Sequence, residues 1–302
     1  MRPSLIFVLL AIVGCGSPSD QIELALDFQP NAAHAGIYST PDLDIRAPSS
    51  SIDSTKLLAS GAVDLAIVDI QDLGLARERG EDIVGIGAIV QRPLAAVIAD
   101  PSVRHARDLE GKRVGISGLP SDEAVLRAVV EGDGGDYDRV ETITIGFSAV
   151  PALTSGKVDA VVAFWNAEGV ALERAGVPTR EFRLDATGIS YPELILAARG
   201  ETAREDPARL RAAVAALADG TRAALADPDE ATERIAAASD AAPELVAAQL
   251  EAISPAFEPV LELDRRDLDS WADFAAGSGI LERRPVLEEL FPMFGSPDPD
   301  QG

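Results

Sequence analysis

One short motif occurs twice in this chain, and its repetition limits the folds that the chain can adopt. Residues 57–69 read LLASGAVDLAIVD, and residues 152–164 read ALTSGKVDAVVAF. In each copy we expect a helix to end at a glycine, Gly61 or Gly156, in the left-handed conformation that glycine tolerates. A strand follows that is apolar without alternation, as in sheets covered on both faces. The repeat therefore predicts two small α/β units.

Other apolar segments complete and connect these units. A first strand precedes each copy of the motif, at residues 22–28 (IELALDF) and 113–117 (RVGIS). Residues 93–99 (PLAAVIA) lead out of the first unit, and residues 194–198 (LILAA) lead back into it. We expect only helices after this return. The predicted fold class is α/β, with two lobes joined by two hinge strands.

The single cysteine, Cys15, follows a segment that is typical of secretory signals. A basic start at Arg2 precedes the apolar run 5–13 and Gly14, and this run is too short to span a bilayer. Residues 12–15 (IVGC) also look like a bacterial lipobox, in which the cysteine carries a lipid. We therefore expect an exported protein with a lipid anchor on Cys15 at the cell envelope. Ordinary secretion is the alternative.

These signals divide the chain into segments with different predicted roles. With one cysteine in the whole sequence, no intrachain disulfide can form, so both lobes must rely on buried cores. The predicted segments are a lipoprotein signal peptide with its lipidation site at 1–15, a tether at 16–21, lobe 1 at 22–95 with 195–290, lobe 2 at 96–194, and a tail at 291–302.

Composition excludes several classes of function. The net charge of −24 repels nucleic acid, so no nucleic-acid partner is expected. His34 and His105 are the only histidines, which argues against a metal site built from cysteine and histidine. No G-x-S-x-G turn is present to hold a nucleophilic serine. We expect a monomer that is not an enzyme and needs no cofactor or metal.

In open α/β sheets, ligands bind beyond the carboxyl ends of the strands. This rule selects four windows: 28–34, 69–72, 117–122 and 164–168. Their carboxylates suit a ligand with N–H donors, whereas a sulfonate would need an arginine or several N–H donors. The candidate ligand contacts are the ring faces of Phe28, Phe164 and Trp165, the acceptors Asp69 and Glu168, the polar groups of Asn31, Gln71, Ser117 and Asn166, and the side chains of His34 and Tyr191. The open alternatives are that His34 caps a helix start and that Tyr191 supports the hinge; Trp271 is expected to pack.

Residues 26–38, LDFQPNAAHAGIY, resemble the opening motif L-D/N-W/F-x-P-N-x-x-H-x-G-x-Y of the solute-binding proteins and synthases concerned with the thiamine pyrimidine. The match continues through RPLAAVIA (92–99), DLEGKRVGI (108–116) and FWNAEG (164–169). The resemblance implies a type II periplasmic-binding-protein fold that delivers a small nitrogen heterocycle to an ABC permease in the membrane. Ligands of the family include hydroxymethylpyrimidine, a formylated aminopyrimidine and, in some relatives, riboflavin.

Some fungal relatives are enzymes that sacrifice a histidine of their own to build the pyrimidine. The aligned position is Gln71 here, and the cysteine cluster of those enzymes is missing. The resemblance thus favours a binding protein over a pyrimidine-precursor synthase, with riboflavin, a sulfonate or another small solute as alternative ligands. The chain also runs almost directly from Ser39 into the strand 43–46, where relatives have a helix. We expect this shortening to open one side of the ligand site.

Overall fold

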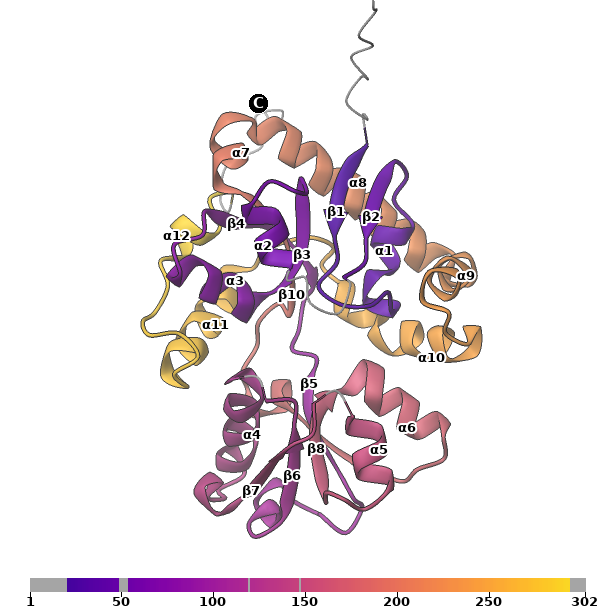
Figure 1. Ribbon diagram of the computed structural model, residues 1–302, viewed down its shortest axis with the longest axis vertical. Coiled ribbons are helices and arrows are strands. Elements are labelled where there is room, and N and C mark those ends of the chain that lie inside the picture. Colours follow the sequence, from indigo (N-terminus) through magenta and orange to yellow (C-terminus); the bar gives the residue numbers. More distant parts are fainter. Residues whose placement is uncertain (1–20, 49–53, 119, 147, 294–302) are drawn as a thin grey trace, which may run out of the picture.

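The computed structural model describes residues 21–48, 54–118, 120–146 and 148–293 of the chain. They form two α/β bodies stacked along the long axis of the molecule, which we call lobe 1 (upper) and lobe 2 (lower) (Figure 1). This arrangement confirms the predicted fold class. The predicted signal peptide, the lipidation site Cys15 and all of the tether except Gln21 lie outside the described residues.

Each lobe is built on a mixed sheet of five strands. In lobe 1 the order is β2-β1-β3-β10-β4, and β10 runs antiparallel between β3 and β4. In lobe 2 the order is β7-β6-β8-β5-β9, and β5 runs antiparallel between β8 and β9. The strands are β1 Ile22–Ala25, β2 Leu43–Arg46, β3 Leu65–Asp69, β4 Ile83–Val90, β5 Ala95–Ala99, β6 Arg113–Ile116, β7 Glu141–Thr144, β8 Ala160–Phe164, β9 Arg180–Arg183 and β10 Leu194–Arg199.

The repeated motif has the same local structure in both lobes. Helix α2 (Ser54–Ala59) precedes Gly61, and helix α5 (Ala149–Thr154) precedes Gly156. The two glycines have φ values of +77° and +68°, which a residue with a Cβ adopts only with strain. Strands β3 and β8 then begin four residues after their glycine. The predicted sequence of helix, glycine turn and buried strand is confirmed in both copies.

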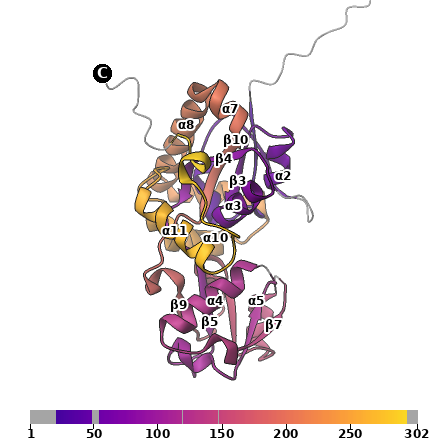
Figure 2. The same ribbon diagram turned by 90° about the vertical axis from the view of Figure 1, so that its left-hand side faces the viewer.

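Helices cover the sheets and fill the C-terminal part of the chain. Within the described residues, the chain forms no named strand after β10. Figure 2 shows α7 and α8 at the far end of lobe 1 and α10 and α11 near the junction with lobe 2. None of the helices in the described ranges combines the length and the apolar character needed to cross a membrane. Besides α2 and α5, they are α1 Ala35–Tyr38, α3 Ile70–Glu78, α4 Pro120–Gly132, α6 Val170–Arg174, α7 Gly200–Glu205, α8 Pro207–Ala226, α9 Pro228–Ser239, α10 Pro243–Ile253, α11 Arg265–Gly277 and α12 Leu287–Leu290.

The chain crosses between the lobes twice. The first crossover is residues 91–94, between β4 and β5, and the second is residues 188–193, before β10. Gln91 fixes the start of the first crossover to lobe 1, since its amide donates to the backbone carbonyls of Ala88, Pro259 and Glu262. Strand β5 starts at Ala95 and strand β10 at Leu194. The lobe boundaries at 95 and 194 stay a prediction.

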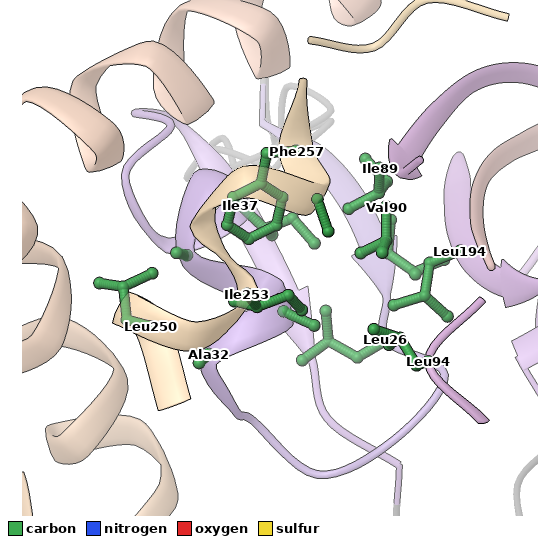
Figure 3. Close-up of a cluster of buried hydrophobic side chains, with 14 of the residues drawn as sticks. Leu26, Ala32, Ile37, Ile89, Val90, Leu94, Leu194, Leu250, Ile253 and Phe257 are labelled. Atoms are coloured by element: carbon green, nitrogen blue, oxygen red, sulfur yellow. The ribbon is translucent and has the colours of Figure 1, made fainter. Parts of the chain in front are cut away.

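One apolar cluster continues from lobe 1 into the first crossover and to the point where the second crossover ends. Leu94 and Leu194 belong to the same buried cluster as Leu26, Ile253 and Phe257 (Figure 3). Burying a leucine or isoleucine side chain stabilises the fold by about 1.5–3 kcal/mol. The crossovers are therefore held by packing as well as by hydrogen bonds.

The predicted tail at 291–302 begins too early. Phe291 is 1% exposed, and its ring meets the ring of Trp271 edge-on, with the centroids 6.2 Å apart. The sequence gives no sign of this contact, because an aromatic residue near a chain end is equally compatible with a disordered tail. Residues 294–302 of the predicted tail lie outside the described residues.

Candidate functional site

The four predicted windows lie on the facing sides of the two lobes. Asp69, the last residue of β3, pairs with Leu194, where the second crossover ends. Phe164, the last residue of β8, pairs with Ala95, where the first crossover ends. Strands β1 and β6 run parallel to β3 and β8, so their carboxyl ends lie at the same edges. We call these two edges the facing edges (Figure 1).

Each facing edge carries an exposed phenylalanine. Phe28, just after β1, is 50% exposed, and Phe164, at the end of β8, is 40% exposed. Among the described residues, Val286 is the only other large apolar side chain with comparable exposure. Large apolar side chains left open to solvent often mark a binding surface. Each lobe thus contributes one exposed aromatic ring to its facing edge.

Trp165 does not have the position predicted for a ring that stacks on a ligand. It is 3% exposed, and the guanidinium of Arg183 lies 4.2 Å from the centroid of its ring. Its indole N–H donates to the carbonyl of Pro93 at 3.0 Å, and its backbone N–H donates to the carbonyl of Leu94 at 3.0 Å. Trp165 thus fixes the end of the first crossover to lobe 2, and its neighbour Phe164 carries the exposed ring.

The side chain of His34 also stabilises the fold and does not face a ligand. The residue is fully buried, and its Nδ1 accepts a hydrogen bond from the backbone N–H of Asn31 at 3.2 Å. Nδ1 is therefore unprotonated, and Nε2–H donates to Oδ1 of Asp27 at 2.8 Å. The side chain of Asn31 accepts from the N–H of Ala33, which completes a capping box at the start of a short helical turn. The capping alternative holds for His34, and neither ring nitrogen is left for a ligand.

Two carboxyl groups meet where β3 and the second crossover adjoin. Asp69 is partly buried and caps α3, accepting from the backbone N–H of Gln71 at 2.7 Å. Glu193 is buried, and its Oε2 accepts from the backbone N–H of Leu94 at 2.7 Å. The two carboxyl groups are close enough for each to influence the pKa of the other. Burial raises the pKa of both groups, and for Asp69 the charge of Glu193 raises it further. The pair therefore holds a proton more readily than two isolated carboxylates would.

Gln71 and Tyr191 lie beside this pair. Gln71 is 4% exposed, and its Oε1 accepts from the indole N–H of Trp271 at 3.0 Å. Tyr191 is 1% exposed, and its ring stacks on Phe274 with the centroids 5.8 Å apart. Burial raises the pKa of the Tyr191 hydroxyl, and the charges of Glu193 and Asp69 add to the rise. The structure thus groups the predicted residues Asp69, Gln71 and Tyr191 with Glu193.

The remaining predicted residues belong to the edge of lobe 2. The hydroxyl and backbone N–H of Ser117 donate to the carboxylate of Asp122, near the start of α4. Glu168 accepts from the backbone N–H of Phe164 at 3.1 Å. Asn166 is 3% exposed, and its Oδ1 has no hydrogen-bond partner among the residues that the structure describes. The bond from Phe164 to Glu168 closes the turn that follows β8 and orients the backbone around Phe164.

Sequence reasoning missed Glu193. The residue stands in YPELILAA, just before the return strand, where a charged residue next to a buried strand is a weak signal on its own. Its importance comes from Leu94 and Asp69, which only the fold brings close. Within the described ranges no group of histidine, cysteine, aspartate and glutamate side chains is arranged to hold a metal ion.

A depression elsewhere in lobe 2 is separate from these residues. It has a volume of about 500 Å³ and is lined by side chains that include His105, Asp133 and Arg183. None of the predicted ligand contacts lines it. The facing edges, where the predicted residues gather, therefore remain the candidate site.

A family model described as NMT1/THI5 like matches residues 33–231. The chain belongs to the NMT1/THI5-like family. It is similar to the formylaminopyrimidine-binding protein of Halalkalibacterium halodurans, with 31% identity over 75% of each chain. It is also similar to the 4-amino-5-hydroxymethyl-2-methylpyrimidine phosphate synthase of Legionella pneumophila, with 26% identity over 56% of this chain and 57% of the relative. The family thus includes binding proteins and synthases.

The fold has a close counterpart among solved structures. The periplasmic aliphatic sulphonate binding protein SsuA of Escherichia coli aligns with a TM-score of 0.74, covering 91% of this chain and 92% of its own. The identity is 13%, so the likeness concerns the fold. The implied periplasmic-binding-protein architecture is confirmed.

Proposed function

We propose that this family member binds a thiamine-precursor aminopyrimidine between its lobes. The observation that carries the proposal is the carboxyl pair Asp69–Glu193, with Glu193 buried, together with the exposed rings of Phe28 and Phe164 on the two facing edges. The similarity to a formylaminopyrimidine-binding protein supports the same ligand class. An amine donates to carboxylates, and a flat ring stacks between phenylalanines, so both features suit this ligand.

The electrostatics of the pair favour such a ligand over a sulfonate. An anionic sulfonate placed near two carboxyl groups would meet repulsion and raise the cost of their ionisation further. An aminopyrimidine offers N–H donors to the carboxylate and lone pairs to the proton that the pair retains. The likeness to a sulphonate-binding protein therefore extends to the fold and leaves the ligand chemistry different.

The binding role is favoured over a synthase by two features of this chain. Gln71 stands where the family resemblance places the histidine that the enzymes consume, and glutamine cannot supply the same ring atoms. His34, the histidine near the facing edges, is buried and capped on both nitrogens. The synthase remains the second candidate because a synthase is among the relatives.

We further propose that the protein works outside the cytoplasm, anchored by a lipid on Cys15, and that it passes its ligand to an ABC permease. The periplasmic location of a protein with the same fold supports this setting. The signal-like segment before Cys15 supports the anchor. Hinge motion at the two crossovers would close the facing edges over the ligand and exclude water.

The test is calorimetry of the purified protein with hydroxymethylpyrimidine and with formylaminopyrimidine, followed by mass spectrometry of ligand and protein. We expect one ligand per chain, recovered unchanged, and an unchanged protein mass. An alkanesulfonate serves as the control ligand and should not bind. Chemical conversion of the pyrimidine, or loss of histidine mass from the protein, would establish the synthase instead.

A further inference from the structure

One buried donor near the candidate site makes no hydrogen bond of normal length and angle. The side-chain Nε2 of Gln71 makes no hydrogen bond with any residue that the structure describes, although Gln71 is only 4% exposed. Leaving a buried N–H unpaired costs stability, so native proteins rarely do it without a reason. A bound ligand with an acceptor atom would satisfy this donor.

The orientation of the Gln71 amide is fixed from the other side. The indole N–H of Trp271 can only donate, and it donates to Oε1 of Gln71 at 3.0 Å. Turning the amide over would set two donors against each other, so Nε2 stays on the side away from Trp271. Trp271 itself is fully buried, and a Cβ added to Gly74 of α3 would lie only 3.0 Å from its ring. The tryptophan therefore has little room to move.

Acceptors and donors are placed close together at this point. Asp69 lies two residues before Gln71 at the start of the same helix and accepts from its backbone N–H. Tyr191 is near both: burial raises the pKa of its hydroxyl, the charges of Glu193 and Asp69 add to the rise, and the Gln71 side-chain amide approaches the hydroxyl and lowers its pKa. The Asp69 carboxyl can accept a hydrogen bond and the Gln71 side-chain amide can donate one. A ligand that carries a donor next to an acceptor would match both groups.

We propose that Gln71 selects ligands that carry a hydrogen-bond acceptor next to an amino group, and that Trp271 is the positioning residue that holds the Gln71 amide as a donor. The proposal rests on the proposed function, because an aminopyrimidine has a ring nitrogen beside its exocyclic amine. In this arrangement Gln71 Nε2 donates to the ring nitrogen, and the Asp69 carboxyl accepts from the amine. In nucleic-acid recognition a single amide makes both contacts with adenine, donating to the ring nitrogen and accepting from the amine, whereas here the two contacts are divided between Gln71 and Asp69.

The test compares hydroxymethylpyrimidine with a deaza analogue in which CH replaces the ring nitrogen next to the amino-bearing carbon. Calorimetry should show that the wild-type protein prefers the parent compound by about tenfold, the value of one hydrogen bond. Gln71→Met should lower the affinity for the parent about tenfold and remove the preference. Trp271→Phe should lower it about threefold, because the amide can then turn over. In the Gln71→Met background, Trp271→Phe should have no further effect on affinity.

Gln91→Met is the matched control, since Gln91 is also buried but donates only to backbone carbonyls in lobe 1. It should lower the melting temperature and leave the ligand preference intact. Retention of the preference in Gln71→Met, or additive effects in the double variant, would overturn the inference while the proposed function stands. If the wild-type protein binds neither pyrimidine, the proposed function fails and the inference fails with it. Should Gln71→Met not fold, the Trp271→Phe result alone decides: an undiminished preference contradicts the positioning role.

Discussion

The carboxylate of Glu193 accepts a hydrogen bond from the backbone N–H of Leu94 at 2.7 Å, although the two residues are 99 positions apart. The bond joins the second crossover to the first. Both crossovers must bend if the lobes move, so the contact places a buried acid at the joint of the molecule. The acid also touches Asp69 of lobe 1 and thereby connects the joint to the candidate site.

Replacing Glu193 by glutamine should change the pH dependence of stability. Burial raises the pKa of Glu193 and of Asp69, so folding favours their protonated forms. Their stabilising contribution is complete below the ordinary carboxyl pKa and is lost as the pH rises through the raised values. Glutamine imitates the protonated acid. Glu193→Gln should therefore melt at a higher temperature than the wild-type protein at neutral and alkaline pH, and the gain should shrink toward about pH 4.

Thermal denaturation across this pH range measures the effect. Glu288→Gln is the control, because Glu288 is exposed and its pKa is lowered, largely by hydrogen bonds from its own backbone and from Arg265. This control should show no gain at neutral pH. Parallel pH profiles for Glu193→Gln and the wild-type protein would contradict a proton held by the pair.

The exposed rings should matter for ligand affinity and little for stability. Phe28→Ala and Phe164→Ala remove rings that are half or nearly half exposed. Each should weaken aminopyrimidine binding by about 1–2 kcal/mol, roughly tenfold, with an almost unchanged melting temperature. Val286→Ala removes the third large apolar side chain that is exposed in the part of the chain that the structure describes, and it should leave affinity unchanged. Calorimetry with hydroxymethylpyrimidine tests the pair, and equal effects of all three variants would argue against a site at the facing edges.

Trp165 should behave in the opposite way to Phe164. It is buried and hydrogen-bonded to the first crossover, so Trp165→Ala should destabilise the fold by about 3–5 kcal/mol in urea denaturation. Trp165→Phe keeps most of the packing and should cost less, mainly the lost hydrogen bond to Pro93. A Trp165→Ala protein with normal stability and abolished binding would restore the stacking role expected from the sequence.

The anchor is tested separately from the site. Cys15→Ser, expressed in a bacterium that processes lipoproteins, should move from the membrane fraction to the soluble fraction, because the lipidated thiol is lost. Ligand affinity of the released protein should be unchanged. Membrane association equal to that of the wild-type protein would show that Cys15 carries no anchor.

Local features of the fold could be predicted from the sequence. Gly61 and Gly156 each end a helix and precede a buried strand, and this information lies within about a dozen neighbouring residues. The windows at the strand ends followed from strand direction alone. Phe28 and Phe164 were placed at the facing edges for the same reason.

Features that depend on distant partners could not be predicted in this way. An aromatic residue after a strand can face solvent or the core, and what decides for Trp165 is the carbonyl of Pro93 and the side chain of Arg183. Glu193 had no recognisable motif, because its partner Leu94 belongs to the other crossover. From the sequence, His34 could either contact a ligand or cap a helix start, and only its two hydrogen-bond partners decide between these roles.

The position of β10 in its sheet has a consequence for the order in which the chain can acquire structure during synthesis. β10 separates β3 from β4, and yet it is the last strand of lobe 1 to emerge from the ribosome. All strands of lobe 2 precede it in the chain, so lobe 2 can complete its sheet while lobe 1 still lacks its inner strand. Until then, the edges of β3 and β4 that will pair with β10 expose unpaired backbone N–H and C=O groups, which can pair with other chains. The late strand makes the first lobe the one that depends most on protection while the chain is incomplete.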